Sequence, residues 1–354
     1  LAKLFDINQI NNLKNEKKKN IQIETKHYEY ETEKRRYVHV DVPGYADYYD
    51  NYTVGISQMD VAILVVNAVH GIMPETNEHL FIAKKMNVKD IIVFVNKTDL
   101  ESDSDMLDIT SLDIKHYLDI YGYSGENKII YGSALEAYKD NDKNKSIQKL
   151  LDTLDNIDIP NRSNDVFFNM PIENVYSITG IGTVVTGKVE QGSIQVGDSV
   201  NIIGFDKDKK SIVKNIKSLD NYLKIGQAGN YIGLLLDKIE IDDVEKGQII
   251  TVPGSKNIKS YKSFEGYFEF IYDLEIRTSI KNYSNLQLYF KTAIIEGRVE
   301  LSDYFGKIES SDKGNIHNIR IHLRKPLPIF KDDNLIIRQS GLILGYIKVN
   351  KILS

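Results

Sequence analysis

The sequence has no cysteine, no tryptophan and only 7 prolines in 354 residues. Without cysteine, disulfide bonds, thiolate zinc sites and cysteine nucleophiles are excluded. No apolar run approaches the roughly 18 residues that a membrane-spanning helix needs, so no membrane contact is expected. The chain begins with Leu1 and Ala2, without an initiator methionine or a signal-peptide pattern. We therefore expect the sequence to begin inside a longer protein.

The charge balance is slightly acidic. Lys and Arg number 45 against 50 Asp and Glu, which gives a formal net charge of −5. A general polyanion-binding surface is not indicated, and any contact with nucleic acid must come from local basic groups. An apolar fraction of 42% and a charged fraction of 27% are ordinary for a globular protein. The length is enough for two or three domains, each with its own core.

The N-terminal part alternates between strand-like and helix-like patterns. Residues 21–30 and 36–42 flank a short charged segment, as the strands of a β-hairpin do. Residues 61–66 and 91–95 are unbroken apolar runs, which predict buried parallel strands. Helical spacing predicts three helices, over residues 76–86, 107–120 and 146–156.

A polar segment at residues 159–164 ends this part, and beyond it the apolar period changes from 3.6 to 2. Glycine and aspartate turns follow at short intervals, which indicates all-β modules and favours barrels over sandwiches. We expect an α/β domain over residues 1–158 and two β-barrels over residues 165–254 and 260–354. In the last module we expect strands at residues 263–272, 286–295, 316–324, 335–339 and 341–349.

Asn96, Lys97 and Asp99 directly follow the apolar run 91–95. In an open α/β sheet, ligands bind outside the carboxyl ends of the parallel strands. A carboxylate at Asp99 can accept hydrogen bonds from the ring N–H and the exocyclic amine of guanine, which adenine cannot offer. Asn96 would tie neighbouring loops together, and the stem of Lys97 would cover one face of the base. The alternative is a solvated turn after a strand.

Asp41, Val42, Pro43 and Gly44 form a second loop at a predicted strand end. The Asp41 carboxylate could hold Mg²⁺ through water, as carboxylates in phosphate-binding sites do. Gly44 would offer its backbone N–H to a terminal phosphate with no Cβ in the way. The alternative is an ordinary Pro-Gly turn.

Ser133, Ala134 and Leu135 form a third loop, after the apolar residues 128–132. A small residue here lets the backbone amide approach the oxygen of a base, although the same residues are common at helix starts. Three polar loops at three strand ends predict a guanine-nucleotide pocket.

Other candidates for chemistry are weaker. Asp119 and Gly122 repeat the Asp-x-x-Gly spacing, which we interpret as a helix end. The histidines show no metal-ligand spacing, so core or surface roles are the better interpretation of His27, His39, His70 and His79.

Longer segments resemble the elongation factor Tu family, over nearly the whole chain. The resemblance implies a P-loop NTPase-like α/β domain followed by two β-barrels. It also implies GTP and GDP as nucleotides, Mg²⁺ as the metal, and GTP-dependent delivery of aminoacyl-tRNA to the ribosomal A site. The implied partners are aminoacyl-tRNA, the ribosome and a guanine-nucleotide exchange factor of the elongation factor Ts type. The matching segments are residues 37–48, 58–66, 71–76, 171–180, 182–187, 246–250 and 348–354.

Three features depart from the family pattern. The phosphate-binding Gly-x-x-x-x-Gly-Lys-Thr loop is missing, because residues 1–3 resemble the helix that follows it, and we interpret this as truncation of the sequence and not as a property of the protein. Gln22 stands where the family has a threonine that ligates Mg²⁺, and its longer side chain changes the geometry. Tyr45 stands where the family has the histidine that positions the attacking water. A phenol, with a pKa of about 10, has limited basicity at neutral pH.

The tRNA-facing segments have changed as well. Arg277, Lys281, Lys291 and Arg338 remain as candidate phosphate contacts, each with a solvated surface charge as the alternative. Leu342 replaces a family arginine. Together with Tyr45 and Gln22 it favours an alternative function, a diverged GTP-binding module with little or no hydrolysis.

Two further expectations concern origin and relatives. The Ile-, Asn-, Lys- and Tyr-rich composition indicates an AT-rich genome, which fits a plastid or mitochondrial protein, with the bacterial cytoplasm as the alternative. A GTPase of initiation or of sulfate activation is disfavoured by the density of elongation-factor segments up to Gly187.

Overall fold

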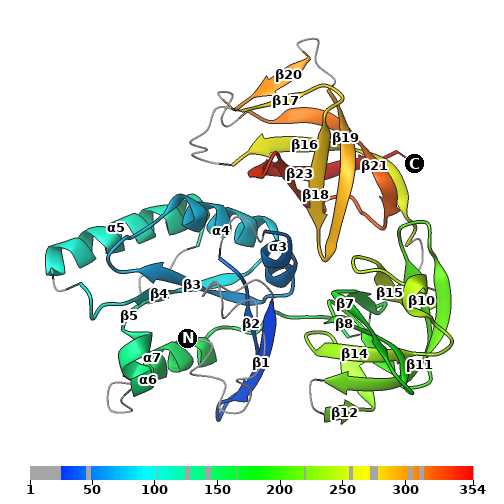
Figure 1. Cartoon of the computed structure of the whole chain (residues 1–354), viewed down its shortest axis with the longest axis horizontal. Helices are drawn as coiled ribbons and strands as arrows, with labels where there is room; N and C mark the ends of the chain where they lie inside the picture. Colours follow the sequence, from blue (N-terminus) through cyan, green and yellow to red (C-terminus); the bar gives the residue numbers. More distant parts are fainter. Residues whose placement is uncertain are drawn as a thin grey trace. The chain divides into compact units, whose positions relative to one another are not determined.

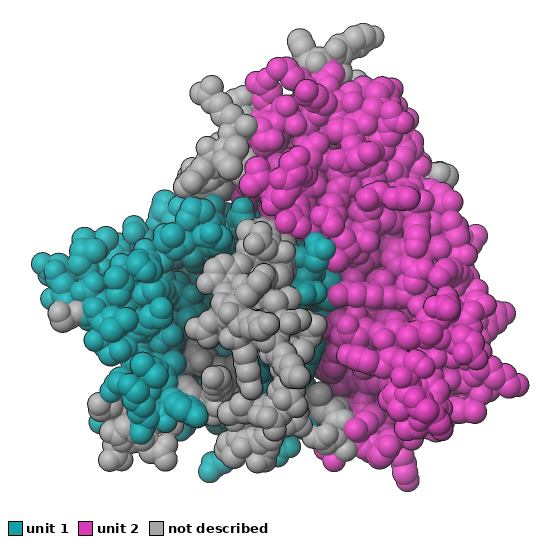
Figure 2. All heavy atoms as spheres, in the orientation of Figure 1, with its two compact units in different colours: residues 1–160 teal, residues 161–354 magenta. Residues whose placement is uncertain are grey.

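The computed structural model describes residues 25–44, 49–101, 103–123, 128–139, 145–164, 166–218, 221–254, 258–271, 278–301, 306–310 and 315–353. The chain divides into two compact units, Leu1–Pro160 and Asn161–Ser354 (Figure 2). The first unit is an α/β domain and the second is built of β-strands (Figure 1). Across the described ranges, every helix is too short or too polar to cross a membrane.

The first unit is organised around a parallel sheet with the strand order β3-β4-β5. β4 (Asp90–Asn96) is central, and its residues 91–95 are buried. β3 (Val61–Asn67) and β5 (Ile129–Tyr131) pair with its two sides. The helices lie on both faces of this sheet (Figure 1): α3 (Tyr49–Ser57), α4 (Pro74–Lys85) and α5 (Ser104–Ile120) on one, α6 (Ala134–Lys139) and α7 (Lys145–Asp155) on the other.

The predicted buried strand over residues 61–66 exists as β3, but it is less buried than its sequence suggests. Val65 is 49% exposed, whereas Val93 on the neighbouring β4 is fully buried. Among the described residues β3 pairs only with β4, so its other edge is not covered by a strand. An apolar run in the sequence shows that a strand can be buried. Whether it is buried depends on the strands that pair with it.

The predicted β-hairpin is confirmed by β1 (Lys26–Glu31) and β2 (Arg36–Asp41), which pair antiparallel. Residues 21–24 of that prediction lie outside the described residues. Tyr37 and Thr32 both donate to Oδ1 of Asp155 near the end of α7, at 2.6 and 2.8 Å. The Arg35 guanidinium donates to the carbonyl oxygen of Ile157 at 2.5 Å. These bonds anchor the hairpin, and with it the end of β2 that carries Asp41.

The three predicted helices are confirmed by α4, α5 and α7, while α3 and α6 were not predicted. Gly55 lies inside α3, and glycine lowers intrinsic helix propensity. A Cβ on Gly55 would lie 2.3 Å from a methyl carbon of Val42, so close packing requires glycine there. Tyr52, Val54 and Ile56 of the same helix are buried. Tertiary packing therefore stabilises a helix that local propensity does not predict.

The first β-module is not the closed barrel that the sequence predicts. Its main sheet is open, curved into a half-barrel, with the order β6-β15-β10-β11-β14-β8-β7 and β12 paired to β11. β9 and β13 form a separate pair. The strands are β6 (Asn169–Pro171), β7 (Asn174–Ile178), β8 (Gly182–Lys188), β9 (Ser193–Gln195), β10 (Ser199–Ile203), β11 (Lys209–Ser218), β12 (Asn221–Leu223), β13 (Ile225–Gln227), β14 (Tyr231–Leu236) and β15 (Ile249–Thr251).

The second β-module is a closed barrel, as predicted, with the strand order β16-β21-β19-β18-β22-β23. The prediction of a single strand over residues 286–295 is wrong. This segment contains two strands joined by a turn at Lys291 and Thr292, and Lys291 has a left-handed φ of 52°. The strands are β16 (Tyr261–Phe270), β17 (Ser279–Lys281), β18 (Asn285–Phe290), β19 (Ala293–Leu301), β20 (Lys307–Glu309), β21 (His317–Leu327), β22 (Asn334–Gln339) and β23 (Leu342–Ile352).

The two β-modules pack on each other through Phe205, which lies in a turn of the first module. Phe205 is 7% exposed and belongs to the apolar core of the closed barrel. Its backbone N–H donates to the carbonyl oxygen of Pro326 at 2.9 Å. Lys325 lies over its ring at 5.3 Å and pairs with Glu245 of the first module at 2.9 Å. Apolar insertion and polar contacts therefore join the modules at the same place.

The Phe205→Ala variant is expected to lose about 3 kcal/mol of unfolding free energy, because it removes a buried ring and leaves a cavity between the modules. Urea denaturation of the full chain, followed by tyrosine fluorescence, measures this. Tyr222→Ala is the control, since Tyr222 is 71% exposed and its loss should cost within about 0.5 kcal/mol. Equal stability of the two variants would show that Phe205 does not hold the modules together.

Candidate functional site

The carboxyl ends of β3, β4 and β5 lie side by side. Asn67 and Asn96, the last residues of β3 and β4, are register partners, and Tyr131 of β5 is aligned with Val95. The N–H of Ala68 donates to the carbonyl oxygen of Asn96 at 2.9 Å. The loops that leave these strands therefore start at one edge of the sheet, where open α/β sheets bind ligands.

The side chain of Asn96 joins two of the predicted loops. Its Oδ1 accepts a hydrogen bond from the N–H of Ala134 at 2.9 Å. The N–H of Thr98 also donates to the carbonyl oxygen of Gly132, at 3.4 Å. A Cβ on Gly132 would lie 2.4 Å from Oγ of Ser146 on α7. Packing against α7 and the Asn96 amide therefore hold the loop after β5 against the loop after β4.

Lys97 and Asp99 are both exposed beside this joined pair of loops. Lys97 has a left-handed φ of 66°, and the N–H of Leu100 donates to its carbonyl oxygen at 3.0 Å. This tight turn fixes the backbone that carries Asp99. On the other loop, Oγ of Ser133 accepts from the N–H of Glu136 at 3.2 Å and caps α6. Ser133 is thus both a helix cap and part of the loop pair.

Asp41 is the last residue of β2, and Val42, Pro43 and Gly44 follow it. Pro43 is buried, Asp41 is half-buried and Gly44 is exposed. Gly44 does not have a left-handed φ, so its backbone conformation is open to any residue. A Cβ added there would meet, among the described residues, only Cε1 of His79, at an ordinary contact distance of 3.9 Å.

This sets Gly44 apart from Gly55 and Gly132. At those two positions a Cβ would lie within 2.4 Å of another side chain, so packing requires glycine. At Gly44 neither backbone conformation nor the described packing does so. Close approach of a ligand to the backbone is one physical reason for a glycine at such a position.

The histidine beside Gly44 was predicted only as a core or surface residue. His79 lies on α4, and its ring stacks on that of Tyr52 from α3, with centroids 4.2 Å apart and 25° between the planes. The Tyr52 hydroxyl donates to the carbonyl oxygen of His79 at 3.2 Å. Burial lowers the pKa of His79 from 6.5 to about 4. The imidazole is therefore neutral at physiological pH.

The pKa of His79 predicts acid sensitivity. Between pH 6.5 and 4 the unfolded chain binds a proton at this histidine that the folded chain does not, so stability falls as the pH falls. His79→Phe is expected to reduce the slope of unfolding free energy against pH by about 1 kcal/mol per unit between pH 6 and 5. Urea denaturation at pH 6.5, 6.0, 5.5 and 5.0 measures it. Identical slopes would mean that His79 is protonated in the folded protein.

Two family profiles match the chain. The profile described as Elongation factor Tu GTP binding domain matches residues 3–159, and the one described as Elongation factor Tu domain 2 matches residues 182–251. The chain belongs to the translational GTPase family. Its α/β unit is therefore the GTP-binding domain, and the joined loops lie at the sheet edge of that domain.

In this translational GTPase, the end of β2 carries a side chain that would fit a magnesium ion held together with a nucleotide. Asp41 supplies one carboxylate at a strand end. Mg²⁺ in nucleotide sites is usually held by one or two protein oxygens together with substrate phosphates, so a single carboxylate is enough. The other two predicted residues of this region, Gln22 and Tyr45, lie outside the described residues.

The candidate tRNA contacts of the translational GTPase lie in different environments. Lys281 is exposed on β17. Lys291 is 21% exposed and pairs with Glu190 of the first β-module at 2.6 Å. Arg338 donates to the hydroxyl of the buried Tyr289 at 3.2 Å. Arg277 lies outside the described residues. Two of the four cations are therefore bound to groups of the protein itself.

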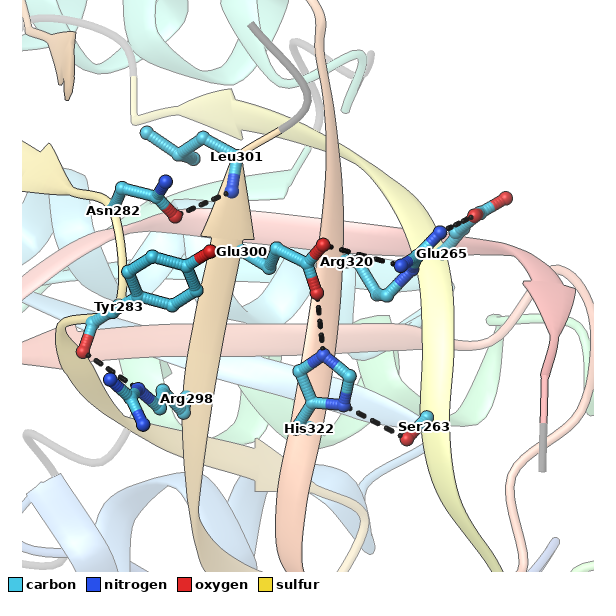
Figure 3. Close-up of polar contacts among 9 residues, drawn as sticks. All are labelled: Ser263, Glu265, Asn282, Tyr283, Arg298, Glu300, Leu301, Arg320 and His322. Atoms are coloured by element: carbon cyan, nitrogen blue, oxygen red, sulfur yellow. Dashed lines mark hydrogen bonds and ion pairs between the residues drawn. The ribbon is translucent and has the colours of Figure 1, made fainter. Parts of the chain in front are cut away.

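The outer face of the closed barrel carries charges that pair across strands (Figure 3). Arg320 on β21 bridges Glu265 on β16, at 2.9 Å, and Glu300 on β19, at 3.3 Å. His322 lies between Glu300, at 2.8 Å, and Ser263, at 3.1 Å. The hydrogen bond with His322 holds the pKa of Glu300 below its usual range. Arg320 is therefore paired with two carboxylates of neighbouring strands.

Proposed function

We propose that this translational GTPase carries aminoacyl-tRNA to the ribosomal A site and hydrolyses GTP there. The observation that supports it best is the pair of loops joined by Asn96 and Ala134, with the Asp99 carboxylate exposed beside them. GTP and GDP with Mg²⁺ are the proposed ligands. Aminoacyl-tRNA, the ribosome and an exchange factor of the elongation factor Ts type are the proposed partners.

In this proposal each loop has one task. Asp99 accepts hydrogen bonds from the ring N–H and the amine of guanine, and the stem of Lys97 covers the base. The backbone of Ser133, Ala134 and Leu135 approaches the base oxygen. Asn96 keeps the two loops at a fixed separation.

The phosphate end is served by the loop after β2. Asp41 holds Mg²⁺, with Gln22 as a further candidate ligand, and bound Mg²⁺ supplies charge neutralisation at the phosphates. Val42 and Pro43 carry the chain to Gly44, whose N–H faces the terminal phosphate. The difference between GTP and GDP at Gly44 is what allows the nucleotide to act as a switch.

The second candidate function is a GTP-binding module with little or no hydrolysis. It is favoured by Tyr45, because a phenol orients and activates water less well than an imidazole at neutral pH. Gln22 in place of the metal-binding threonine favours it as well. Lys281 and Arg277 are the proposed phosphate contacts on tRNA in either case, with Lys291 and Arg338 available only if their present bonds break.

Two measurements on the full-length protein test the proposal. Equilibrium binding of GTP, GDP and ATP should show guanine selectivity. GTP turnover with and without ribosomes then separates the two candidates, since the carrier hydrolyses GTP when ribosomes are present and the module does not. Binding of ATP as tight as that of GTP would contradict both.

We also propose a plastid or mitochondrial location, supported by the Ile-, Asn-, Lys- and Tyr-rich composition, with 22 Tyr and 7 Pro. Microscopy of the tagged full-length protein in its host tests this. A bacterial cytoplasm is the alternative outcome.

A further inference from the structure

We propose that His79 is a positioning residue that fixes the backbone at Gly44 and thereby sets the preference for GTP over GDP. This inference rests on the proposed function, in which the Gly44 N–H meets the terminal phosphate. GDP lacks that phosphate. A residue that acts only through Gly44 therefore affects GTP binding and leaves GDP binding nearly unchanged.

The geometry is consistent with such a role because the ring of His79 lies close to Gly44. Among the described residues, Cε1 of His79 is the heavy atom nearest to a Cβ built on Gly44, at 3.9 Å, so the ring lies next to the glycine. Gly44 is exposed. An exposed backbone next to a fixed ring can present its N–H to a ligand.

The ring of His79 is itself held firmly. Tyr52 stacks on it at 4.2 Å and binds the backbone of the same residue through its hydroxyl, at 3.2 Å. Tyr52 is 4% exposed, so the stacked pair is anchored in the core between α3 and α4. The ring next to Gly44 is therefore held by two helices of the GTP-binding domain.

The test is the ratio of the dissociation constants for GTP and GDP, measured with fluorescent nucleotides on the full-length protein. His79→Ala removes the ring next to Gly44. We expect GTP binding to weaken about tenfold, the typical loss for one hydrogen bond to a charged group. GDP binding should change less than about twofold. His79→Phe keeps a flat ring in the same place and should keep the wild-type ratio.

His116→Ala is the matched control, because His116 is an exposed histidine on α5 of the same domain. It should leave both constants unchanged. If His79→Ala weakens the binding of GTP and GDP equally, or weakens neither, the positioning role is contradicted. A purely structural residue does not change the ratio of the two dissociation constants. A wild-type protein that binds no guanine nucleotide would instead contradict the proposed function.

Discussion

Asp99→Asn is expected to transfer the nucleotide preference of the protein from GTP to xanthosine triphosphate. The carboxylate that accepts from the ring N–H and the amine of guanine becomes an amide, which presents a donor in its place. Hydrogen bonds to charged groups contribute about 1.5–3 kcal/mol each, so GTP binding should weaken on the order of 10²-fold or more. Competition of unlabelled nucleotides against a fluorescent guanine nucleotide measures both affinities in the full-length protein.

Asp103→Asn provides the control for this experiment. Asp103 is exposed four residues further along the chain, and its carboxylate accepts from the N–H of Asp105 to cap α5. Asparagine caps helices about as well as aspartate, so stability and nucleotide binding should both be unchanged. An Asp99→Asn protein that still prefers GTP would remove Asp99 from the base-binding site.

Tyr45→His is expected to raise ribosome-stimulated GTP turnover. A positioned acid–base group typically contributes about 10²–10⁴-fold to a rate, and an imidazole near neutral pH suits the changing charge better than a phenol. GTP affinity should change little, because Asp99 and the phosphate-binding residues carry the binding. Single-turnover hydrolysis with saturating ribosomes measures the effect.

Tyr138→His controls for a new histidine in the same domain, since Tyr138 is 59% exposed on α6. It should leave turnover at the wild-type level. If the wild-type protein already hydrolyses GTP rapidly on the ribosome and Tyr45→His gains nothing, water is positioned by another group. In that case the alternative of a module without hydrolysis is excluded as well.

Much of the fold was predictable because the decisive signals are local. The apolar runs marked β3 and β4, and the change from helical to alternating periodicity marked the start of the β-modules. The turn between β18 and β19 was missed because Lys291 adopts a left-handed φ without glycine. The helix α3 was missed because Gly55 and its neighbours favour helix only through tertiary contacts.

In the candidate site, too, residues marked by local sequence could be predicted and residues brought in by tertiary packing could not. Asn96, Asp99 and Gly44 could be selected from sequence because each lies at the end of a strand or within three residues of it. His79 could not, because it lies 35 residues beyond Gly44 in the chain and reaches it only when α4 packs against the rest of the domain. The pairing of Lys291 with Glu190 was likewise hidden, since it joins residues of two different β-modules.

The most direct test of the account is whether aminoacyl-tRNA binding depends on the terminal phosphate of the nucleotide. The anisotropy of a fluorescent aminoacyl-tRNA is followed while the full-length protein is titrated, once with a non-hydrolysable GTP analogue and once with GDP. The account predicts binding at least about tenfold tighter with the GTP analogue, which is within the range of coupling between sites in switch proteins. Equal affinity for aminoacyl-tRNA with the GTP analogue and with GDP, or no binding with either, would contradict the function proposed for this translational GTPase.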